Sequence, residues 1–170
     1  QIAKASGVTR GAVYWHFEDK GALINELRLQ LTQMFTEQVD AFLLDETRLD
    51  ALTALEQGLK KLFLILEENS TVREILAIWF GQGSFVNALP DSTQAVAKCH
   101  QDFIAKIYSV YVRAIEKGSV RKGVSAHILA LDTDAFVVGL IRNWLLNVDQ
   151  VKIREQVSEI IAAHIELRRP

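Results

Sequence analysis

The residues best suited to chemistry in this chain lie close together near its start, between Thr9 and Lys20. Thr9 can cap a short helix that ends at Phe17, after a turn that contains Gly7. On that helix Val13 and Phe17 are four residues apart and can both face a core, which leaves polar side chains on the opposite face. The segment therefore predicts a helix-turn-helix motif whose second helix presents a polar face to solvent.

This polar face suits contact with DNA. The guanidinium of Arg10 can bond guanine O6 and N7 in the major groove, and Tyr14 and His16 can reach phosphate oxygens from the same face. Gly11 keeps the start of the helix bare, so that the backbone can approach the duplex closely. Lys20 can meet another phosphate at the start of the next helix. We therefore expect this short helix to recognise double-stranded DNA.

The run Gly7-Val-Thr-Arg-Gly-Ala-Val-Tyr-Trp-His-Phe-Glu-Asp-Lys20 resembles the recognition-helix signature of TetR-type transcriptional repressors, particularly the branch that regulates multidrug efflux. The resemblance implies a helix-turn-helix domain of three helices, a larger helical ligand-binding domain, and a homodimer formed by the last two helices. The family's first helix and part of its second are expected to be absent from this chain. For DNA contact the resemblance implies Thr9, Tyr14, His16 and Lys20 on the backbone, and Arg10, Gly11, Tyr14 and Trp15 at base edges.

A second, looser resemblance lies later in the chain. The segment Val138-Gly-Leu-Ile-Arg-Asn-Trp144-Leu-Leu is similar to an Asp-Gly-Leu and Trp-Leu stretch of the efflux-regulator branch. Val138 stands where that branch often has Asp, and the Cys-Glu pair that follows the sixth helix in that branch has no counterpart here. The ligand chemistry of this half therefore rests on the pattern of its own residues.

Apolar residues recur at steps of three and four almost throughout, which is the helical period and predicts an all-α protein. We expect an N-terminal helix-turn-helix DNA-binding domain at residues 1–30 and a helical-bundle domain for ligand binding and dimerisation at 31–170. The expected helix caps are Asp19, Ser70 or Thr71, and Asp91 or Ser92, with a loop between Gly81 and Pro90 and a C-cap glycine at Gly118.

The helix between Ala126 and Leu146 is apolar around nearly its whole circumference, so it must be covered on both sides. Covering by a second copy of the chain is the simplest explanation, because terminal helices of a monomer usually lie at its periphery. The expected dimer interface comprises Phe136, Ile141, Trp144, Leu145, Val157, Ile160, Ile161 and His164.

The resemblance also implies a ligand pocket between the helices from Leu49 to Leu146, and the aromatic content favours a small hydrophobic or aromatic effector. Aromatic residues at these positions equally suit a core, and His100 equally suits a satisfied core histidine. Trp15 equally suits packing within the small domain. The expected pocket residues are Phe63, Trp79, Phe80, Cys99, His100, Phe103, Ile107, Phe136, Leu140 and Asn143.

Composition narrows the functional classes. The 170 residues carry 19 Lys and Arg against 21 Asp and Glu, a net charge of −2, which excludes a polycation that binds nucleic acid without regard to sequence. The longest apolar run is far shorter than the ~20 residues that span a bilayer, and a single cysteine allows no internal disulfide. We expect a cytoplasmic protein with no membrane segment.

The sequence favours neither an enzyme nor a metalloprotein. It has no glycine-rich phosphate loop or nucleophile elbow, and Asp132 and Asp134, two residues apart, point in different directions on a helix. Cys99 and the four histidines are scattered without the short paired spacings of zinc sites. We therefore expect no enzymatic activity, no metal and no cofactor.

Two functions remain from different classes. The first is a ligand-responsive repressor, whose dimer binds a near-palindromic operator and releases it when an effector changes the separation of its recognition helices. The second is a helical small-molecule-binding or interaction protein whose helix-turn-helix no longer reads DNA. The first is the leading hypothesis, because the recognition-helix signature is continuous.

Overall fold

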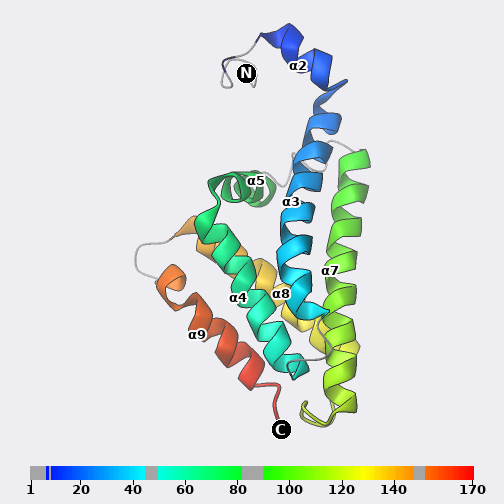
Figure 1. Ribbon diagram of the computed structural model, residues 1–170, viewed down its shortest axis with the longest axis vertical. Coiled ribbons are helices and arrows are strands. Elements are labelled where there is room, and N and C mark those ends of the chain that lie inside the picture. The colour runs from blue at the N-terminus through cyan, green and yellow to red at the C-terminus, as the bar shows by residue number, and fades with distance from the viewer. Residues whose placement is uncertain (1–6, 8, 45–49, 82–89, 148–151) are drawn as a thin grey trace.

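A computed structural model describes residues 7, 9–44, 50–81, 90–147 and 152–170, and every regular element within these ranges is a helix (Figure 1). The predicted all-α architecture is thereby confirmed. The first helix of the expected helix-turn-helix falls on residues outside the described ranges. The described helices are α2 (Arg10–His16), α3 (Lys20–Leu43), α4 (Ala51–Glu68), α5 (Ser70–Gly81), α7 (Pro90–Glu116), α8 (Ala126–Leu146) and α9 (Ile153–Glu166).

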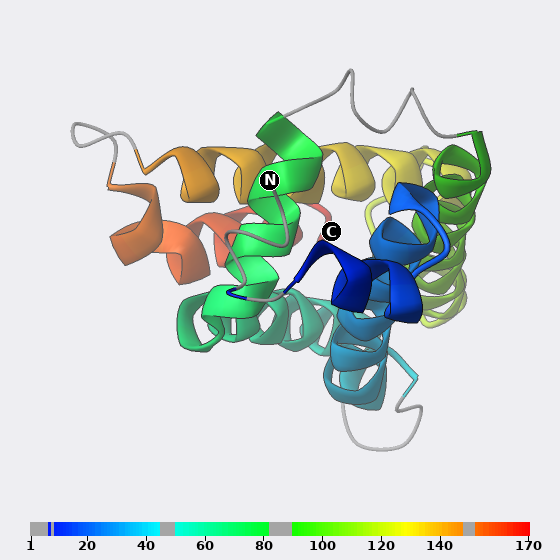
Figure 2. The ribbon, with the colours of Figure 1, turned by 90° about the horizontal axis from the view of Figure 1, so that it is seen from above.

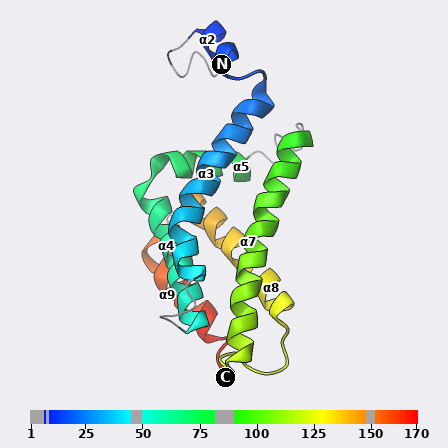
Figure 3. The ribbon, with the colours of Figure 1, turned by 45° about the vertical axis from the view of Figure 1, so that its right-hand side comes forward.

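Helix α3 connects the start of the chain to the main bundle. Asp19 caps it as predicted, because its carboxylate accepts a hydrogen bond from the backbone N–H of Ala22 at 2.8 Å. The helix then continues for 24 residues, its upper end carrying α2 beyond the bundle and its lower half packing on α4 and α7 (Figures 1 and 3). The expected domain boundary between residues 30 and 31 therefore falls inside one continuous helix.

Two of the expected helix caps are wrong. Helix α5 is capped by Asn69 rather than by Ser70 or Thr71, because the Asn69 side-chain oxygen accepts from the N–H of Val72 at 3.1 Å. The backbone N–H of Asn69 also bonds the Ile65 carbonyl at 3.0 Å, so that one residue ends α4 and starts α5.

Helix α7 begins at Pro90, so Asp91 and Ser92 lie inside its first turn and cannot be its cap. Proline suits this first position because it lacks an N–H that would be unpaired there in any case. The other end of α7 follows the prediction. Gly118 adopts a φ of +69° beyond the helix, and the N–H of Ser119 bonds the Ala114 carbonyl at 2.9 Å. The expected loop at residues 82–89 lies outside the described ranges.

Helix α4 packs against α3, α5, α7 and α9, and Figure 2 shows it along one side of the bundle, next to α3. Leu52, Leu55, Leu59 and Leu66 on α4 are fully buried, which confirms the apolar stripe read from the sequence. The tightest approach is at Gly58, where a Cβ atom would lie 3.0 Å from Cδ2 of Leu43 on α3. Helices α3 and α4 can pack this closely only because residue 58 has no side chain.

Asp50 caps α4 and also ties it to the C-terminal residues. Its carboxylate accepts from the N–H groups of Leu52 at 3.2 Å and Thr53 at 3.1 Å, and from the Arg169 guanidinium at 3.1 Å. Partial burial alone would raise the pKa of Asp50, but hydrogen bonds from the Thr53 hydroxyl, Arg169 and the two backbone groups together lower the pKa to about 2. The folded state therefore favours the carboxylate.

Asp50→Ala is expected to lower the free energy of unfolding by about 1 kcal/mol at neutral pH, because a cap is lost and the Arg169 pair is partly screened by solvent. A carboxyl group with a lowered pKa stabilises fully above its ordinary value of 3.8 and loses this contribution as the pH falls towards about 2. Urea unfolding of both proteins should show the difference shrinking below pH 4. Asp102→Asn, at an exposed position on α7, is the control; an equal cost there would contradict the role of Asp50.

Candidate functional site

Helix α2 is a short, capped helix at one end of the molecule. The Thr9 hydroxyl oxygen accepts from the N–H of Ala12 at 3.1 Å, which confirms Thr9 as its cap. The helix spans seven residues and is followed by Asp19 and Lys20 at the start of α3. Arg10, Val13 and Lys20 are placed on these helices, although the described structure does not extend to their side chains. The start of α2 and the start of α3 are therefore both set by capping residues next to them in the sequence.

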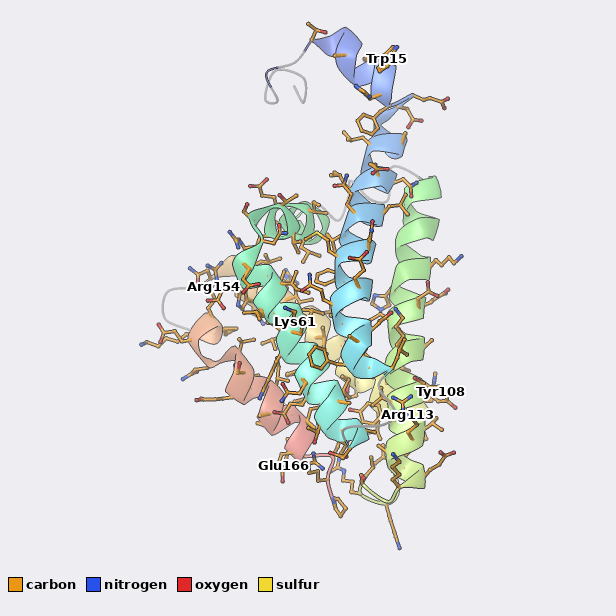
Figure 4. The ribbon with its side chains drawn as sticks, viewed as in Figure 1. Trp15, Lys61, Tyr108, Arg113, Arg154 and Glu166 are labelled. Carbon is orange, nitrogen blue, oxygen red and sulfur yellow. The ribbon has the colours of Figure 1, made fainter. Side chains whose placement is uncertain are left out.

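The side chains of α2 project into solvent. Tyr14 is 59% exposed and Trp15 is 81% exposed, while Gly11 and His16 are exposed beside them. The rings of Trp15 and His16 meet edge to face, with centroids 4.8 Å apart. Figure 4 shows Trp15 at the far end of the molecule, away from the bundle. The alternative that Trp15 packs within the small domain is therefore not supported, because its side chain is exposed.

An exposed aromatic ring on a short helix adds little to folding stability, so its contribution must lie elsewhere. Tyr, Trp and His together offer a hydroxyl, an indole N–H and an imidazole on one surface, and all of these groups can bond phosphate or base edges. The described part of α2 therefore presents polar groups that can bond phosphate or base edges, and their contact with DNA stays a prediction.

The expected pocket residues lie on four helices of the bundle. Phe63 on α4, Ile107 on α7 and Leu140 on α8 are buried, and Phe103 and Phe136 are partly buried. Asn143 is exposed. Trp79, Phe80 and Cys99 belong to α5 and α7, and their side chains lie outside the described structure. Their role as effector contacts stays a prediction.

His100 is not a core histidine, because its side chain is 47% exposed. It reaches across from α7 to α8, where its Nε2 lies 2.9 Å from Oδ2 of Asp134. Burial raises the pKa of Asp134, and the charge and hydrogen bond of His100 act in the opposite direction. The other oxygen, Oδ1, is buried and has no hydrogen-bond partner among the described residues.

Sequence reasoning considered Asp134 only as one member of a carboxylate pair with Asp132. The two carboxylates do face different neighbours, since Asp132 pairs with Arg168 near the C-terminus while Asp134 faces α7. The missed signal was an acidic residue within a helix that is otherwise apolar around its circumference. Such a residue must either be paired or face a cavity.

A second polar cluster joins α7, α8 and α9. The Tyr111 hydroxyl lies 2.7 Å from Oγ1 of Thr133, which in turn lies 3.2 Å from Nε2 of His164. The His164 ring stacks on Phe136, with centroids 3.7 Å apart. Arg168 donates a hydrogen bond to the His164 carbonyl at 2.6 Å. This buried network holds the three helices in a fixed register.

The expected dimer residues divide into two groups within the protomer. Ile141, Trp144, Ile161 and His164 are buried by the chain's own helices, whereas Phe136, Leu145, Val157 and Ile160 are partly buried. Their contact with a second copy stays a prediction. Helix α8 also exposes large apolar side chains, namely Ile128, Leu131 and Leu146.

Within the described ranges, no cluster of three or more His, Cys, Asp or Glu residues is arranged to hold a metal ion. None of the helices in those ranges combines the length and apolar character needed to cross a membrane.

Two family descriptions match this chain, one at each end. Residues 1–27 match the N-terminal domain described as "Bacterial regulatory proteins, tetR family". Residues 50–169 match the description "MAATS-type transcriptional repressor, C-terminal region". Together they include both α2 and the helices that contain the His100–Asp134 pair.

Individual relatives agree with this match. The chain is 28% identical over 172 residues to the HTH-type transcriptional regulator TtgR of Pseudomonas putida, covering 99% of this chain and 80% of TtgR. The crystal structure of NalD, the secondary repressor of the MexAB-OprM multidrug efflux pump in Pseudomonas aeruginosa, aligns with a TM-score of 0.79 at 25% identity, covering 99% and 83%. The SmeT–triclosan complex shares the fold, with a TM-score of 0.80 at 19% identity, covering 99% and 80%.

Proposed function

This chain belongs to the TetR family of bacterial regulatory proteins, and from that premise we propose that it represses a multidrug efflux pump gene and is released from the operator by a small hydrophobic or aromatic effector. The observation that carries the proposal is the exposed face of α2, where Tyr14, Trp15 and His16 project from the end of α3. NalD is a repressor of a multidrug efflux pump, and SmeT was solved with triclosan, which supports this class of gene and effector. Such a repressor acts in the cytoplasm, where its DNA lies.

A homodimer places two α2 helices on one face of the assembly. Two recognition helices enter successive major grooves only if their separation matches one helical turn of DNA, about 34–36 Å, or a multiple of it. The operator is therefore near-palindromic, since each copy of α2 reads an equivalent half-site. In this assembly the exposed apolar side chains of α8 and the partly buried ones of α9 face the second copy.

The route from effector to DNA runs through α7 and α3. Lys106 of α7 bonds the Asp40 carboxylate of α3 at 2.7 Å, and Arg113 of α7 donates to the Leu43 carbonyl at 2.6 Å. Figure 4 shows Arg113 on α7 near the lower end of α3. Because α3 is continuous up to α2, an effector that moves α7 also tilts α3 and changes the separation of the two α2 helices.

The test measures binding of the full-length protein to its own promoter region in a gel-retardation titration. Tyr14→Phe combined with Lys20→Ala is expected to weaken binding about tenfold for every sequence and to reduce the salt dependence by about one counterion, because phosphate contacts are lost. Arg10→Ala is expected to cost about 1–3 kcal/mol and to relax the base preference at one position in each half-site.

Tyr108→Phe, at an exposed position on α7 far from α2, is the matched control and should bind as the wild type does. Unchanged binding by both Arg10→Ala and the Tyr14→Phe, Lys20→Ala double variant would remove the assignment of α2 as the recognition helix. Ligand binding without any operator binding would favour the alternative of a helical small-molecule-binding protein.

A further inference from the structure

Two arginines join helix α9 to helix α8, one at each end of the pair. At the start of α9, Cζ of Arg154 lies 4.3 Å from the centroid of the Trp144 ring, near the end of α8, and its Nε donates to the Trp144 carbonyl at 3.0 Å. Just beyond the end of α9, Arg168 is bonded to the Asp132 carboxylate near the start of α8. Figure 4 shows Arg154 where α8 ends and α9 begins. The two helices are therefore antiparallel and are held together at both ends.

Each arginine also bonds a carbonyl at a helix C-terminus. The last four carbonyls of an α-helix have no partner within the helix, and positive charge is favoured beside them. The Trp144 carbonyl belongs to this group in α8, and the His164 carbonyl belongs to it in α9. Arg168 donates to the His164 carbonyl at 2.6 Å. A side chain without a donor could therefore replace neither Arg154 nor Arg168.

These contacts matter because direct backbone packing between α8 and α9 is sparse. Helix α8 packs mainly on α7, and α9 packs mainly on α4. Near Arg168 the hydrogen bond between Thr133 and His164 also joins α8 to α9. At the other end, Arg154 provides the polar contact between α8 and the first turn of α9 in the described part of the chain. The angle between the two helices therefore depends strongly on these two arginines.

We propose that Arg154 and Arg168 are positioning residues that set the angle between α8 and α9, and through it the separation of the two α2 helices in the homodimer. This inference rests on the proposed function, in which α8 and α9 face the second copy. That copy contacts a surface made jointly by two helices, so a change in their angle changes the orientation of the partner protomer. The displacement is larger at α2 than at the interface, because α2 lies beyond the bundle at the end of α3 (Figure 1).

The test measures the preference of the full-length protein for one spacing between half-sites. Gel-retardation titrations compare the natural operator with the same operator lengthened by one base pair between its half-sites. In Arg154→Ala the ratio of the two affinities is expected to fall about threefold or more, because a loosened contact between α8 and α9 allows other separations of the α2 helices. A variant that is only less stable would lose affinity for both operators by the same factor and keep the wild-type ratio.

Three further variants make the test specific. Arg154→Lys keeps a cation beside the Trp144 ring and is expected to restore most of the wild-type ratio. Asp132→Asn weakens the contact with Arg168 at the other end, and Asp132 is 59% exposed, so the core is not opened. It is expected to lower the ratio in the same direction. Lys152→Ala removes an equal charge from an exposed side chain that pairs with Glu155, and should keep the wild-type ratio.

The outcomes separate this inference from the proposed function. If Arg154→Ala and Asp132→Asn both keep the wild-type ratio, the repressor proposal stands and the positioning role is overturned. An equal fall in Lys152→Ala overturns it as well. If the wild type binds neither operator, the proposed function itself fails. Thermal unfolding shows which variants are folded, and if Arg154→Ala is not, the ratio in Asp132→Asn decides.

Discussion

Acidification from pH 7 to pH 4 is expected to lower the free energy of unfolding by about 3 kcal/mol through the imidazole of His164 alone. Burial lowers the pKa of His164 from 6.5 to about 4; the positive charge of Arg168 adds to the effect, and Asp132 opposes it. Between pH 6.5 and pH 4, His164 is mostly protonated in the unfolded chain but mostly neutral in the folded chain. The contribution of His164 is therefore fully present above pH 6.5 and is lost as the pH falls towards 4.

The hydrogen-bond network around His164 explains why its imidazole stays neutral in the folded state. A neutral imidazole can accept from Thr133 through Nε2, which leaves the Thr133 oxygen free to accept from the Tyr111 hydroxyl. Protonation turns Nε2 into a donor, so it can no longer accept the hydrogen bond from the Thr133 hydroxyl. The stacked Phe136 ring at 3.7 Å keeps water from the imidazole face, so the charge would stay poorly solvated.

Urea unfolding of the wild type and His164→Gln between pH 7.5 and pH 4, at one fixed protein concentration, measures this contribution. The variant is expected to lose most of the pH dependence, whatever its stability at neutral pH. His127→Gln, at an exposed position near the start of α8, is the control and should follow the wild-type curve. Parallel curves for the wild type and His164→Gln would show that another group titrates.

The second large effect is expected at the crossing of α3 and α4. Gly58→Val should lower the free energy of unfolding by about 2–3 kcal/mol, because the added methyl groups must enter a packed core. The new Cβ would lie 3.0 Å from Leu43 Cδ2 and 3.5 Å from Phe42 Cβ, and Leu43 is fully buried and cannot turn to solvent. Chemical denaturation measures the change, and a loss of operator binding at the same time would show that the lower half of α3 has moved.

Gly139→Val is the matched control for this substitution. Gly139 is also a helical glycine, on α8, but an added Cβ there meets no heavy atom of the described residues within 4 Å. Within the protomer the expected change is within about 0.5 kcal/mol, since no packing of the described residues is disturbed and valine suits a helix better than glycine does. A cost that depends on protein concentration would come from the face of α8 that we propose lies against the second copy. A cost at position 139 equal to that at position 58 would contradict the packing argument.

Sequence patterns predicted the parts of this protein that depend on near neighbours. The caps at Thr9, Asp19 and Gly118 were predicted because each bonds backbone groups within a few residues of itself. The cap of α5 was missed because Asn69, Ser70 and Thr71 are adjacent and all can cap a helix. The choice between them depends on where α4 ends, which is set by packing rather than by local preference.

The contacts between helices of the bundle could not be predicted from sequence patterns in the same way. The pattern of α8 indicated that the helix is apolar on all sides, but a pattern cannot say which neighbour covers which side. Ile161 and His164 were expected at the dimer interface, and the structure shows that the protomer's own helices bury both side chains. Their contact with a second copy stays a prediction. Asp134 was likewise visible in the sequence, although nothing there indicated that His100 would bond one of its oxygens, or that the other would find no partner in the part of the chain that the structure describes.

The sequence by itself predicted the helices, the exposed polar face of α2 and the family, because helix periodicity, capping and the motif that starts at Gly7 are properties of residues close together in the chain. Only the tertiary structure decided that burial keeps His164 neutral, that Oδ1 of Asp134 is buried without a hydrogen-bond partner among the described residues, and that α3 is bonded to α7. The physical reason is that desolvation and charge pairing depend on groups from other helices. Their positions follow from packing of the whole chain and from no local pattern.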